Sequence, residues 1–363
     1  MEGEKEMNRK KKYFTVKELK QIEKDCDYLF LLGERANGKS YSVKSHTLTQ
    51  AFKSIENGHC TRQIGYIRRF DLDCKDSMLE PYFADMPIQE ITKGVYTHIS
   101  VYRKKIYFAH LDDNGKVKRD ICIGQCFALS SAEHYKSLMF PYIFNIIYEE
   151  VISENNAYLF NEPQKLQQLI STILRDRTGK VYLIGNTLSR MCPYYNEFGL
   201  VNVEQLEQGN TNIYDVDNTI IKVHRTASTQ HNSNMFFGQA KKNITEGEYI
   251  TNVYPHIQDK LKDYDILHTV VLKYNNFMYL MRFMKHLNKK FYVWYVEPKT
   301  TPIQDYTRVV ALEYNSSVYW TMGFLPISYN EDVAFKLLLN QNKIVFSDNL
   351  TGTEFYNILK YFK

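Results

Sequence analysis

The chain has 363 residues, of which 44% are hydrophobic and 24% are charged, and its formal net charge is +5. This composition is typical of a globular protein with room for two domains. No apolar run approaches the ~20 residues of a membrane span, so we expect neither membrane association nor a signal peptide. Six cysteines without a CxxC pair favour reduced thiols over a disulfide framework or a zinc site.

The first predicted elements are a basic arm over residues 1–12 and a short helix over 15–25. A solvated face is the alternative reading of the arm, which ends in the basic run Arg9, Lys10, Lys11 and Lys12. The net positive charge permits a polyanionic partner but does not demonstrate one.

The next segment combines a strand, a phosphate-binding loop and a helix. The apolar run 28–32 predicts a buried strand, and it is followed by a complete G-x-x-x-x-G-K-[ST] motif from Gly33 to Ser40. The two glycines would let successive N–H groups face the β-phosphate, Lys39 would lie between the β- and γ-phosphates, and Ser40 would ligate Mg²⁺. A helix over 39–57, closed by Gly58, would point its positive end at the nucleotide.

A chance match in a glycine-containing loop is the alternative. The strand before the motif and the helix after it are the context that the motif requires, so they favour nucleotide binding. We therefore expect ATP to be bound by Gly33, Glu34, Arg35, Ala36, Asn37, Gly38, Lys39, Ser40 and Tyr41.

A second buried strand, 63–69, ends in Arg68 and Arg69. Polar residues at the carboxyl edge of a parallel sheet lie beside the ligand, so the arginines are candidates to contact phosphate or a neighbouring subunit. Surface arginines at a strand end are an equally good reading.

A short helix is predicted over 74–84, followed by a hairpin of 95–108 and 116–121 around the turn 112–115. Basic residues on the hairpin form either a solvated face or a surface that follows DNA phosphates. These residues are Arg103, Lys104, Lys105, Lys116, Lys118 and Arg119. A separate apolar segment is expected over 121–129.

The apolar run 142–150 predicts a buried strand that ends in Glu149 and Glu150. This pattern is that of a Walker B motif, in which the first carboxylate orients Mg²⁺ and the second polarises the attacking water. Glu149 stands where aspartate is usual.

A helix is predicted to start near Pro163, with an apolar stripe that ends before Arg175 and Arg177. These arginines can act as fingers across an interface or can complement the helix dipole. The strand 180–186 then ends in Asn186, where a sensor of the γ-phosphate would lie. The alternation of strands and helices predicts a parallel sheet of the RecA-like kind.

The character of the chain changes after residue 186. A small hairpin is expected over 213–224 and a polar stretch over 226–234, where we expect the domain boundary. A small α+β domain should follow. Its expected strands are 267–273, 277–283, 291–297, 308–314 and 318–322, and its expected helix is 332–340.

Taken in this order, these motifs resemble the DNA-packaging (encapsidation) ATPases of small podophages of the Picovirinae/Salasmaviridae kind, which are related to FtsK/HerA ATPases. The resemblance is specific over about 28–195 and looser beyond. It implies a RecA-like P-loop ATPase domain over 1–226, a linker over 227–256, and an RNase H-like domain without nuclease chemistry over 257–363. The fold class is thus α/β with a small α+β domain.

The resemblance also implies roles for single residues. Arg35 matches a basic residue inside the phosphate loop, Arg175 an arginine finger acting in trans, and Asn186 the asparagine that closes the next strand. The catalytic set would be Glu150, Arg175, Arg35 and Asn186, with Ser40 and Glu149 at the metal. Asp71 departs from the family, which tends to have a basic pore-loop residue there, so Lys75, Lys104 and Lys105 are candidates for the DNA contact.

The function implied is an ATP-driven motor that moves double-stranded DNA into a procapsid with ATP and Mg²⁺. Its partners would be DNA, the phage portal, other copies of the chain in a homopentamer, and a structural packaging RNA as a further candidate. It would work in the host cytoplasm, transiently on the procapsid. A helicase or kinase of the P-loop class and an NTP-binding assembly protein are the alternatives.

Overall fold

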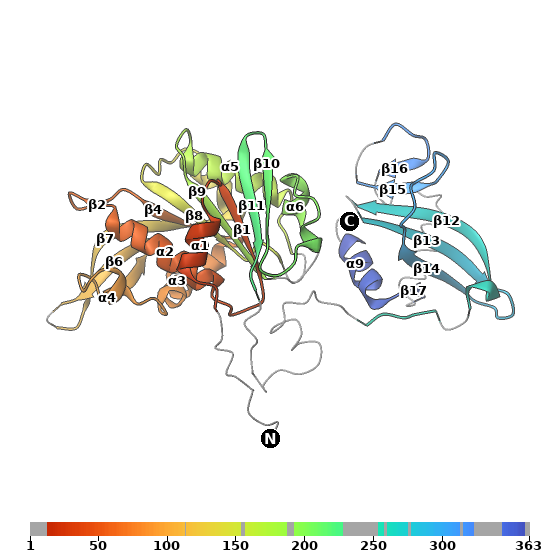
Figure 1. Cartoon of the computed structure of the whole chain (residues 1–363), viewed down its shortest axis with the longest axis horizontal. Coiled ribbons are helices and arrows are strands. Elements are labelled where there is room, and N and C mark those ends of the chain that lie inside the picture. The colour runs from red at the N-terminus through yellow and green to blue at the C-terminus, as the bar shows by residue number, and fades with distance from the viewer. Residues whose placement is uncertain are drawn as a thin grey trace, which may run out of the picture. The chain divides into compact units, whose positions relative to one another are not determined.

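The computed structural model describes residues 13–112, 114–153, 157–186, 192–227, 253–257, 260–274, 277–312, 315–322 and 343–359. The chain divides into two compact units, Met1–Tyr249 and Ile250–Lys363 (Figure 1). The expected basic arm, and all but the ends of the expected linker, lie outside the described residues. No helix in the described ranges is long and apolar enough to cross a membrane.

The first unit is a mixed α/β structure. Its strands are β1 (Tyr28–Gly33), β2 (Ile55–Glu56), β3 (His59–Cys60), β4 (Gln63–Arg68), β5 (His98–Tyr102), β6 (Lys105–Leu111), β7 (Val117–Ala128), β8 (Ile143–Glu149), β9 (Lys180–Asn186), β10 (Thr211–Val216) and β11 (Thr219–Arg225). Its α-helices are α1 (Val16–Ile22), α2 (Lys39–Lys53), α3 (Asp76–Phe83), α4 (Ile88–Ile91), α5 (Glu162–Leu174) and α6 (Pro193–Glu197).

Nine of these strands form one sheet, in the order β10-β11-β1-β9-β8-β4-β7-β6-β5. The six strands from β11 to β7 run parallel, and β10, β6 and β5 are antiparallel additions at the edges. The expected α/β class with a parallel sheet is confirmed. Because β1, β9, β8 and β4 end at the same edge, the residues that follow them meet there.

Helices cover both faces of this sheet (Figure 1). In β1, Leu29 and Leu31 pack in the core that contains Val43 and Leu48 of α2, while Phe30 and Leu32 pack in the core that contains α5. A strand that is buried on both faces needs apolar residues at successive positions, which explains the unbroken apolar run.

Several boundaries differ from the sequence prediction. Helix α2 ends at Lys53, not at residue 57, because β2 and β3 form a small antiparallel pair whose turn contains Asn57 and Gly58. The single strand expected over 95–108 is two strands, β5 and β6, and the apolar segment 121–129 is largely the second half of β7. The helix expected over 74–84 is α3, preceded by a short 3-10 turn, Asp71–Cys74.

The second unit has the strands β12 (Tyr264–Tyr274), β13 (Phe277–His286), β14 (Tyr292–Pro298), β15 (Val309–Ala311), β16 (Trp320–Met322) and β17 (Ile344–Phe346), and the helix α9 (Asn349–Leu359). They form a six-stranded sheet in the order β16-β15-β12-β13-β14-β17. The strands β12, β13 and β14 are an antiparallel meander, and α9 packs against β14 and β17. The sequence analysis missed β17 and α9, and the helix expected over 332–340 lies outside the described residues.

Candidate functional site

The loop after β1 has a backbone that only glycine suits at its two ends. Gly33 has φ +155 and Gly38 has φ +96. A Cβ atom would lie 2.0 Å from Thr226 Oγ1 at Gly33, and 2.7 Å from the carbonyl oxygen of Phe14 at Gly38. Glycine is therefore required at both positions, because a Cβ atom would clash with a close neighbour and because φ is positive. Helix α2 begins directly after the loop, so its positive end faces the concave side of the loop.

The Lys39 side chain is buried inside this loop, with 4% of its surface exposed. Its Nζ donates to the carbonyl oxygen of Glu34 at 2.6 Å and to Asn37 Oδ1 at 3.1 Å. Burial lowers the pKa of Lys39 to about 8. An anion beside Nζ would reverse that shift, so the loop is electrostatically suited to one.

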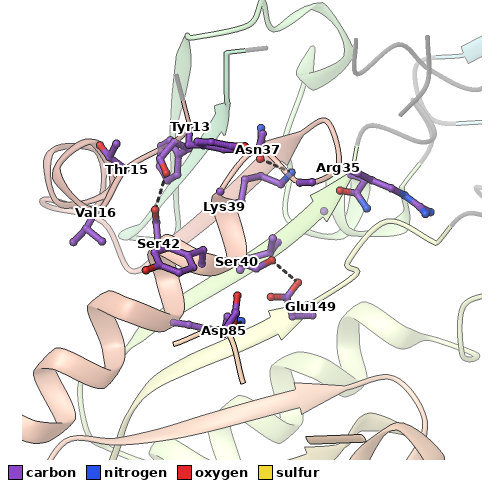
Figure 2. A pocket seen from close by; sticks show the side chains of 18 of the residues that line it. Tyr13, Thr15, Val16, Arg35, Asn37, Lys39, Ser40, Ser42, Asp85 and Glu149 are labelled. Atoms are coloured by element: carbon purple, nitrogen blue, oxygen red, sulfur yellow. Dashed lines mark hydrogen bonds and ion pairs between the residues drawn. The ribbon is translucent and has the colours of Figure 1, made fainter. Parts of the chain in front are cut away.

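Ser40 and Glu149 approach each other at the carboxyl edge of the sheet (Figure 2). Ser40 Oγ donates to Glu149 Oε2 at 3.2 Å, and the hydroxyl of Tyr82 donates to Glu149 Oε1 at 2.7 Å. Burial raises the pKa of Glu149. A hydroxyl beside a carboxylate is a set of hard oxygen donors, which suits Mg²⁺.

Glu150 differs from its neighbour in exposure and in conformation. It has φ +60, and 62% of its side chain is exposed. Arg68, at the end of β4, donates from Nη2 to Glu150 Oε2 at 3.2 Å. The two carboxylates therefore differ: Glu149 is buried beside Ser40, and Glu150 stands at the rim.

Arg69 is a structural residue in this structure, contrary to the phosphate or surface role considered from the sequence. Its Nε donates to both carboxylate oxygens of the buried Glu162, at 3.1 and 2.9 Å, and its Nη2 donates to the carbonyl oxygen of Glu150 at 3.0 Å. Glu162 also accepts from the hydroxyls of Tyr148 and Tyr194, at 2.8 and 2.7 Å. This network ties the start of α5 to the end of β8.

A cavity of about 720 Å³ brings most of the predicted residues together. Its lining residues come from the loop and α2, from residues 13–16, from Asp85, from the two carboxylates and from the end of β9, where Asn186 pairs in register with Gly33. They are Tyr13, Phe14, Thr15, Val16, Arg35, Ala36, Asn37, Gly38, Lys39, Ser40, Tyr41, Ser42, Lys44, Asp85, Glu149, Glu150, Ile184, Gly185 and Asn186.

The sequence analysis missed one wall of this cavity, residues 13–16. The backbone N–H of Phe14 donates to the carbonyl oxygen of Asn37 at 2.8 Å, and Ser42 Oγ donates to the carbonyl oxygen of Phe14 at 2.8 Å. Figure 2 shows Tyr13, Thr15 and Val16 on the side of Lys39 away from Arg35. The Thr15–Glu18 capping box marks the start of α1 in the sequence. Nothing in the sequence indicates that this start lies beside the cavity.

Arg175 lies away from this cavity. It caps the C-terminus of α5 with φ +51, and its Nη2 donates to the carbonyl oxygen of Leu138 at 3.2 Å. Arg177 donates to the carbonyl oxygens of Ile143 and Phe140, at 2.8 and 2.7 Å. Both arginines are thus beside the start of β8, at the opposite edge of the sheet from the loop Gly33–Ser40.

The candidate DNA-contacting lysines also lie outside the cavity lining. Lys75 and Lys105 are exposed, whereas Lys104 forms an ion pair of 2.5 Å with Asp71. The backbone N–H groups of Arg103 and Lys104 donate to the Asp76 carboxylate, at 2.8 and 2.9 Å. The turn between β5 and β6 is therefore attached to the start of α3.

Comparison with known protein families and proteins gives one consistent result. The model of a family described as podovirus DNA encapsidation protein (Gp16) matches residues 8–312. The DNA packaging protein of Bacillus phage B103 is 31% identical over 181 residues, which are 47% of this chain and 48% of that protein. The DNA packaging protein of Bacillus phage phi29 is 27% identical over 175 residues, 47% of this chain and 46% of that protein. The chain spans about half the length of these curated relatives in the matches.

Two solved structures are similar over nearly the whole chain. The bacteriophage Phi-29 viral genome packaging motor assembly has a TM-score of 0.58 at 20% identity, covering 97% of this chain and 100% of that chain. The Phi-28 gp11 DNA packaging motor has a TM-score of 0.52 at 19% identity, covering 97% and 98%. At these identities the likeness shows a shared fold.

Proposed function

Because the chain belongs to the podovirus DNA encapsidation protein (Gp16) family, we propose that it is an ATP-driven motor that moves double-stranded viral DNA into a procapsid. The observation that carries this proposal is the cavity in which Lys39, Ser40, Glu149 and Glu150 meet at the carboxyl edge of a parallel sheet. That arrangement suits the binding and hydrolysis of a nucleoside triphosphate, which a translocating motor needs.

The residues that line the cavity suggest how Mg·ATP would bind. Phosphates would bind to the loop from Gly33 to Ser40 and to the buried ammonium of Lys39, and the nucleoside would extend toward Tyr13, Val16 and Tyr41. Ser40 and Glu149 would hold Mg²⁺, the latter through water, and the ion would neutralise charge on the β- and γ-phosphates. Arg35 and Asn186 line the same cavity, and we assign them to the γ-phosphate end.

Glu150 is the candidate general base. It stands at the exposed rim of the cavity, where a water molecule can reach both its carboxylate and a bound γ-phosphate. Arg68 orients this carboxylate through the contact at 3.2 Å. A positioned carboxylate of this kind contributes roughly 10²–10⁴-fold to the rate of a reaction.

Arg175 would complete the active site of a neighbouring subunit. Helix α5 has 13 residues and is therefore about 20 Å long. Its C-terminus lies at the opposite edge of the sheet from the phosphate-binding loop, so Arg175 cannot reach its own nucleotide. A ring of identical subunits, a homopentamer by family analogy, would bring Arg175 to the next cavity.

We assign residues 1–226 to a RecA-like P-loop ATPase domain, 227–256 to a linker, and 257–363 to an RNase H-like domain without nuclease activity. In the described part of the second unit, no group of three or more histidine, cysteine, aspartate or glutamate side chains could hold a metal ion. Glu297 of β14 is instead paired with Arg282 at 2.7 Å.

Lys75, Lys104 and Lys105 are the proposed DNA contacts, made with phosphates because a packaging motor must ignore base sequence. The proposed partners are double-stranded DNA, the phage portal and a structural packaging RNA. The motor would act in the host cytoplasm, transiently on the procapsid.

ATP hydrolysis by the purified protein should be stimulated by double-stranded DNA together with portal-bearing procapsids. The Lys39→Ala variant should lose hydrolysis and keep its fold, since Lys39 belongs to the loop and not to either apolar core. A rate of hydrolysis that did not change with DNA and procapsids would favour an NTP-binding assembly protein. Transfer of phosphate to a small acceptor would favour a P-loop kinase.

A further inference from the structure

Tyr82 of α3 contacts the carboxylate that the proposed function assigns to the metal. Its hydroxyl donates to Glu149 Oε1 at 2.7 Å, while Ser40 Oγ donates to Glu149 Oε2 at 3.2 Å. The two oxygens of one carboxylate are therefore held by two different elements, α3 and the start of α2. Tyr82 is distant from the phosphate-binding motif in the sequence, and no sequence pattern singles it out.

The Tyr82 ring is itself held in place. It stacks on Tyr66, with ring centroids 4.5 Å apart and an interplanar angle of 26°, and it meets Phe83 edge to face at 4.9 Å. Lys44 Nζ lies 4.4 Å from the centre of the Tyr82 ring and donates to the carbonyl oxygen of Tyr82 at 2.6 Å. Contacts on several sides leave the hydroxyl little freedom, which is what a positioning group requires.

The identity of residue 149 explains why a second donor is useful. Glutamate has one more methylene than the aspartate that is usual here, and therefore one more rotatable bond that must be fixed before the carboxylate can face a metal. The carboxylate of this longer side chain contacts Ser40 and Tyr82 together. A buried carboxylate needs such donors, because burial without hydrogen bonds is costly.

We propose that Tyr82 is a positioning residue for metal binding, whose hydroxyl holds the Glu149 carboxylate in the orientation that faces Ser40. The proposal rests on the proposed function, because it needs Mg²⁺ to bind with nucleotide at Ser40 and Glu149. It adds α3 to the elements that build the site. The same helix starts at Asp76, which holds the turn of Arg103 and Lys104.

The Tyr82→Phe variant tests this inference, because it removes the hydroxyl and keeps the ring packing. We would measure the affinity of the full-length protein for a fluorescent ATP analogue, once in Mg²⁺ and once in EDTA. We expect a roughly tenfold weaker affinity in Mg²⁺, the effect of a hydrogen bond to a charged group, and an unchanged affinity in EDTA.

Tyr96→Phe is the matched control. The hydroxyl of Tyr96 donates to Asp120 Oδ2 at 2.8 Å, so this variant also loses a bond from a tyrosine to a carboxylate, but outside the cavity lining. It should bind the analogue like the wild type in both conditions. If Tyr96→Phe lost as much affinity for the analogue in Mg²⁺ as Tyr82→Phe, the loss would reflect a general change in protein stability. That result would overturn the inference.

A double-mutant cycle separates a positioning role from a merely structural one. In Glu149→Asp the side chain is one methylene shorter, and we expect its carboxylate to lose the contact with Tyr82. Adding Tyr82→Phe in this background should therefore change the affinity in Mg²⁺ by less than about twofold. If Tyr82→Phe lowered the affinity in Mg²⁺ equally in the wild type and in Glu149→Asp, the inference would be overturned. The proposed function would be unaffected. Failure of the wild type to bind the analogue more tightly in Mg²⁺ would overturn both.

Discussion

Arg68 and Glu150 form an ion pair across the edge of the sheet where β4 and β8 end, with Nη2 and Oε2 3.2 Å apart. The contact is specific to the second of the two adjacent carboxylates, since Glu149 is turned toward Ser40 and Tyr82 instead. Two neighbouring glutamates are thus held in different environments by partners from different elements. This separation predicts different consequences for the same substitution at the two positions.

Glu150→Gln should bind ATP and fail to hydrolyse it. Glutamine keeps the size and the hydrogen bonding of the side chain but cannot accept the proton of the attacking water, so turnover should fall by roughly 10²–10⁴-fold. In the ATP-bound state, Glu150→Gln should keep DNA bound. The measurements are steady-state ATPase rates, ATP affinity, and retention of DNA by the assembled motor.

Glu149→Gln provides the contrast, because the lost charge would face the proposed Mg²⁺. Its Mg²⁺-dependent affinity for ATP should fall, whereas its affinity in EDTA should not. Tight binding without turnover in Glu149→Gln, combined with near-normal turnover in Glu150→Gln, would mean that the two roles are reversed.

ATP affinity should decline as the pH rises through about 8, because burial lowers the pKa of Lys39 to about 8 in the free protein. Bound phosphates favour the charged ammonium, so binding takes up a proton above this pH, and the affinity can fall by at most about tenfold per pH unit. Titration of a fluorescent ATP analogue between about pH 7.5 and 9.5 measures the slope. The Lys39→Ala variant should bind weakly at every pH, and an equal slope in that variant would assign the effect to another group.

Arg69→Ala should destabilise the protein rather than act on nucleotide binding directly. It would leave the Glu162 carboxylate, which is 0% exposed, without its charged partner. Removing one partner of a buried ion pair typically costs about 3–5 kcal/mol, measurable as a fall in the free energy of unfolding in urea. Arg103→Ala, in which the lost side chain is exposed, should change this free energy by less than about 0.5 kcal/mol. An unchanged free energy of unfolding in Arg69→Ala would show that the hydrogen bonds between Arg69 and Glu162 do not contribute to stability.

The centre of the fold was predictable because burial on both faces leaves a strong local signal. The strands β1, β4, β8 and β9 are near-continuous apolar runs, and the polar residues that follow them converge because parallel strands end at one edge. The loop from Gly33 to Ser40, with its two glycines at positive φ, follows from its motif. Lys39, Ser40, Glu149, Glu150 and Asn186, which belong to this loop or to the ends of these strands, line one cavity.

The parts that were missed depend on contacts between distant residues. The turn at Arg103 and Lys104 has two positive φ values without a glycine or asparagine, and it is stabilised by Asp76 of another element. The wall formed by residues 13–16 depends on hydrogen bonds to Asn37 and Ser42. Asn57 and Gly58 are equally typical of a helix end and of a hairpin turn, and pairing of β2 with β3 decides between them.

Arg175 should act on the nucleotide of the next subunit rather than on its own. Its guanidinium is bound to the carbonyl oxygen of Leu138 at the edge of the sheet opposite the cavity, an exposed contact that an interface could replace. A trans-acting arginine that stabilises charge on the γ-phosphate is worth roughly 10³-fold or more in the rate of hydrolysis. Arg175→Ala subunits and Lys39→Ala subunits should therefore each be inactive alone.

Mixing these two variants tests the direction of action. In a mixed ring, an intact Arg175 from a Lys39→Ala subunit can meet an intact pocket in an Arg175→Ala subunit, so hydrolysis should partly recover. The recovery should depend on the mixing ratio and reach a maximum at intermediate values, because it needs unlike neighbours. Native mass spectrometry of the mixture provides the control, since it detects mixed rings directly. Mixed rings without recovered hydrolysis would identify Arg175 as a structural residue that only caps α5.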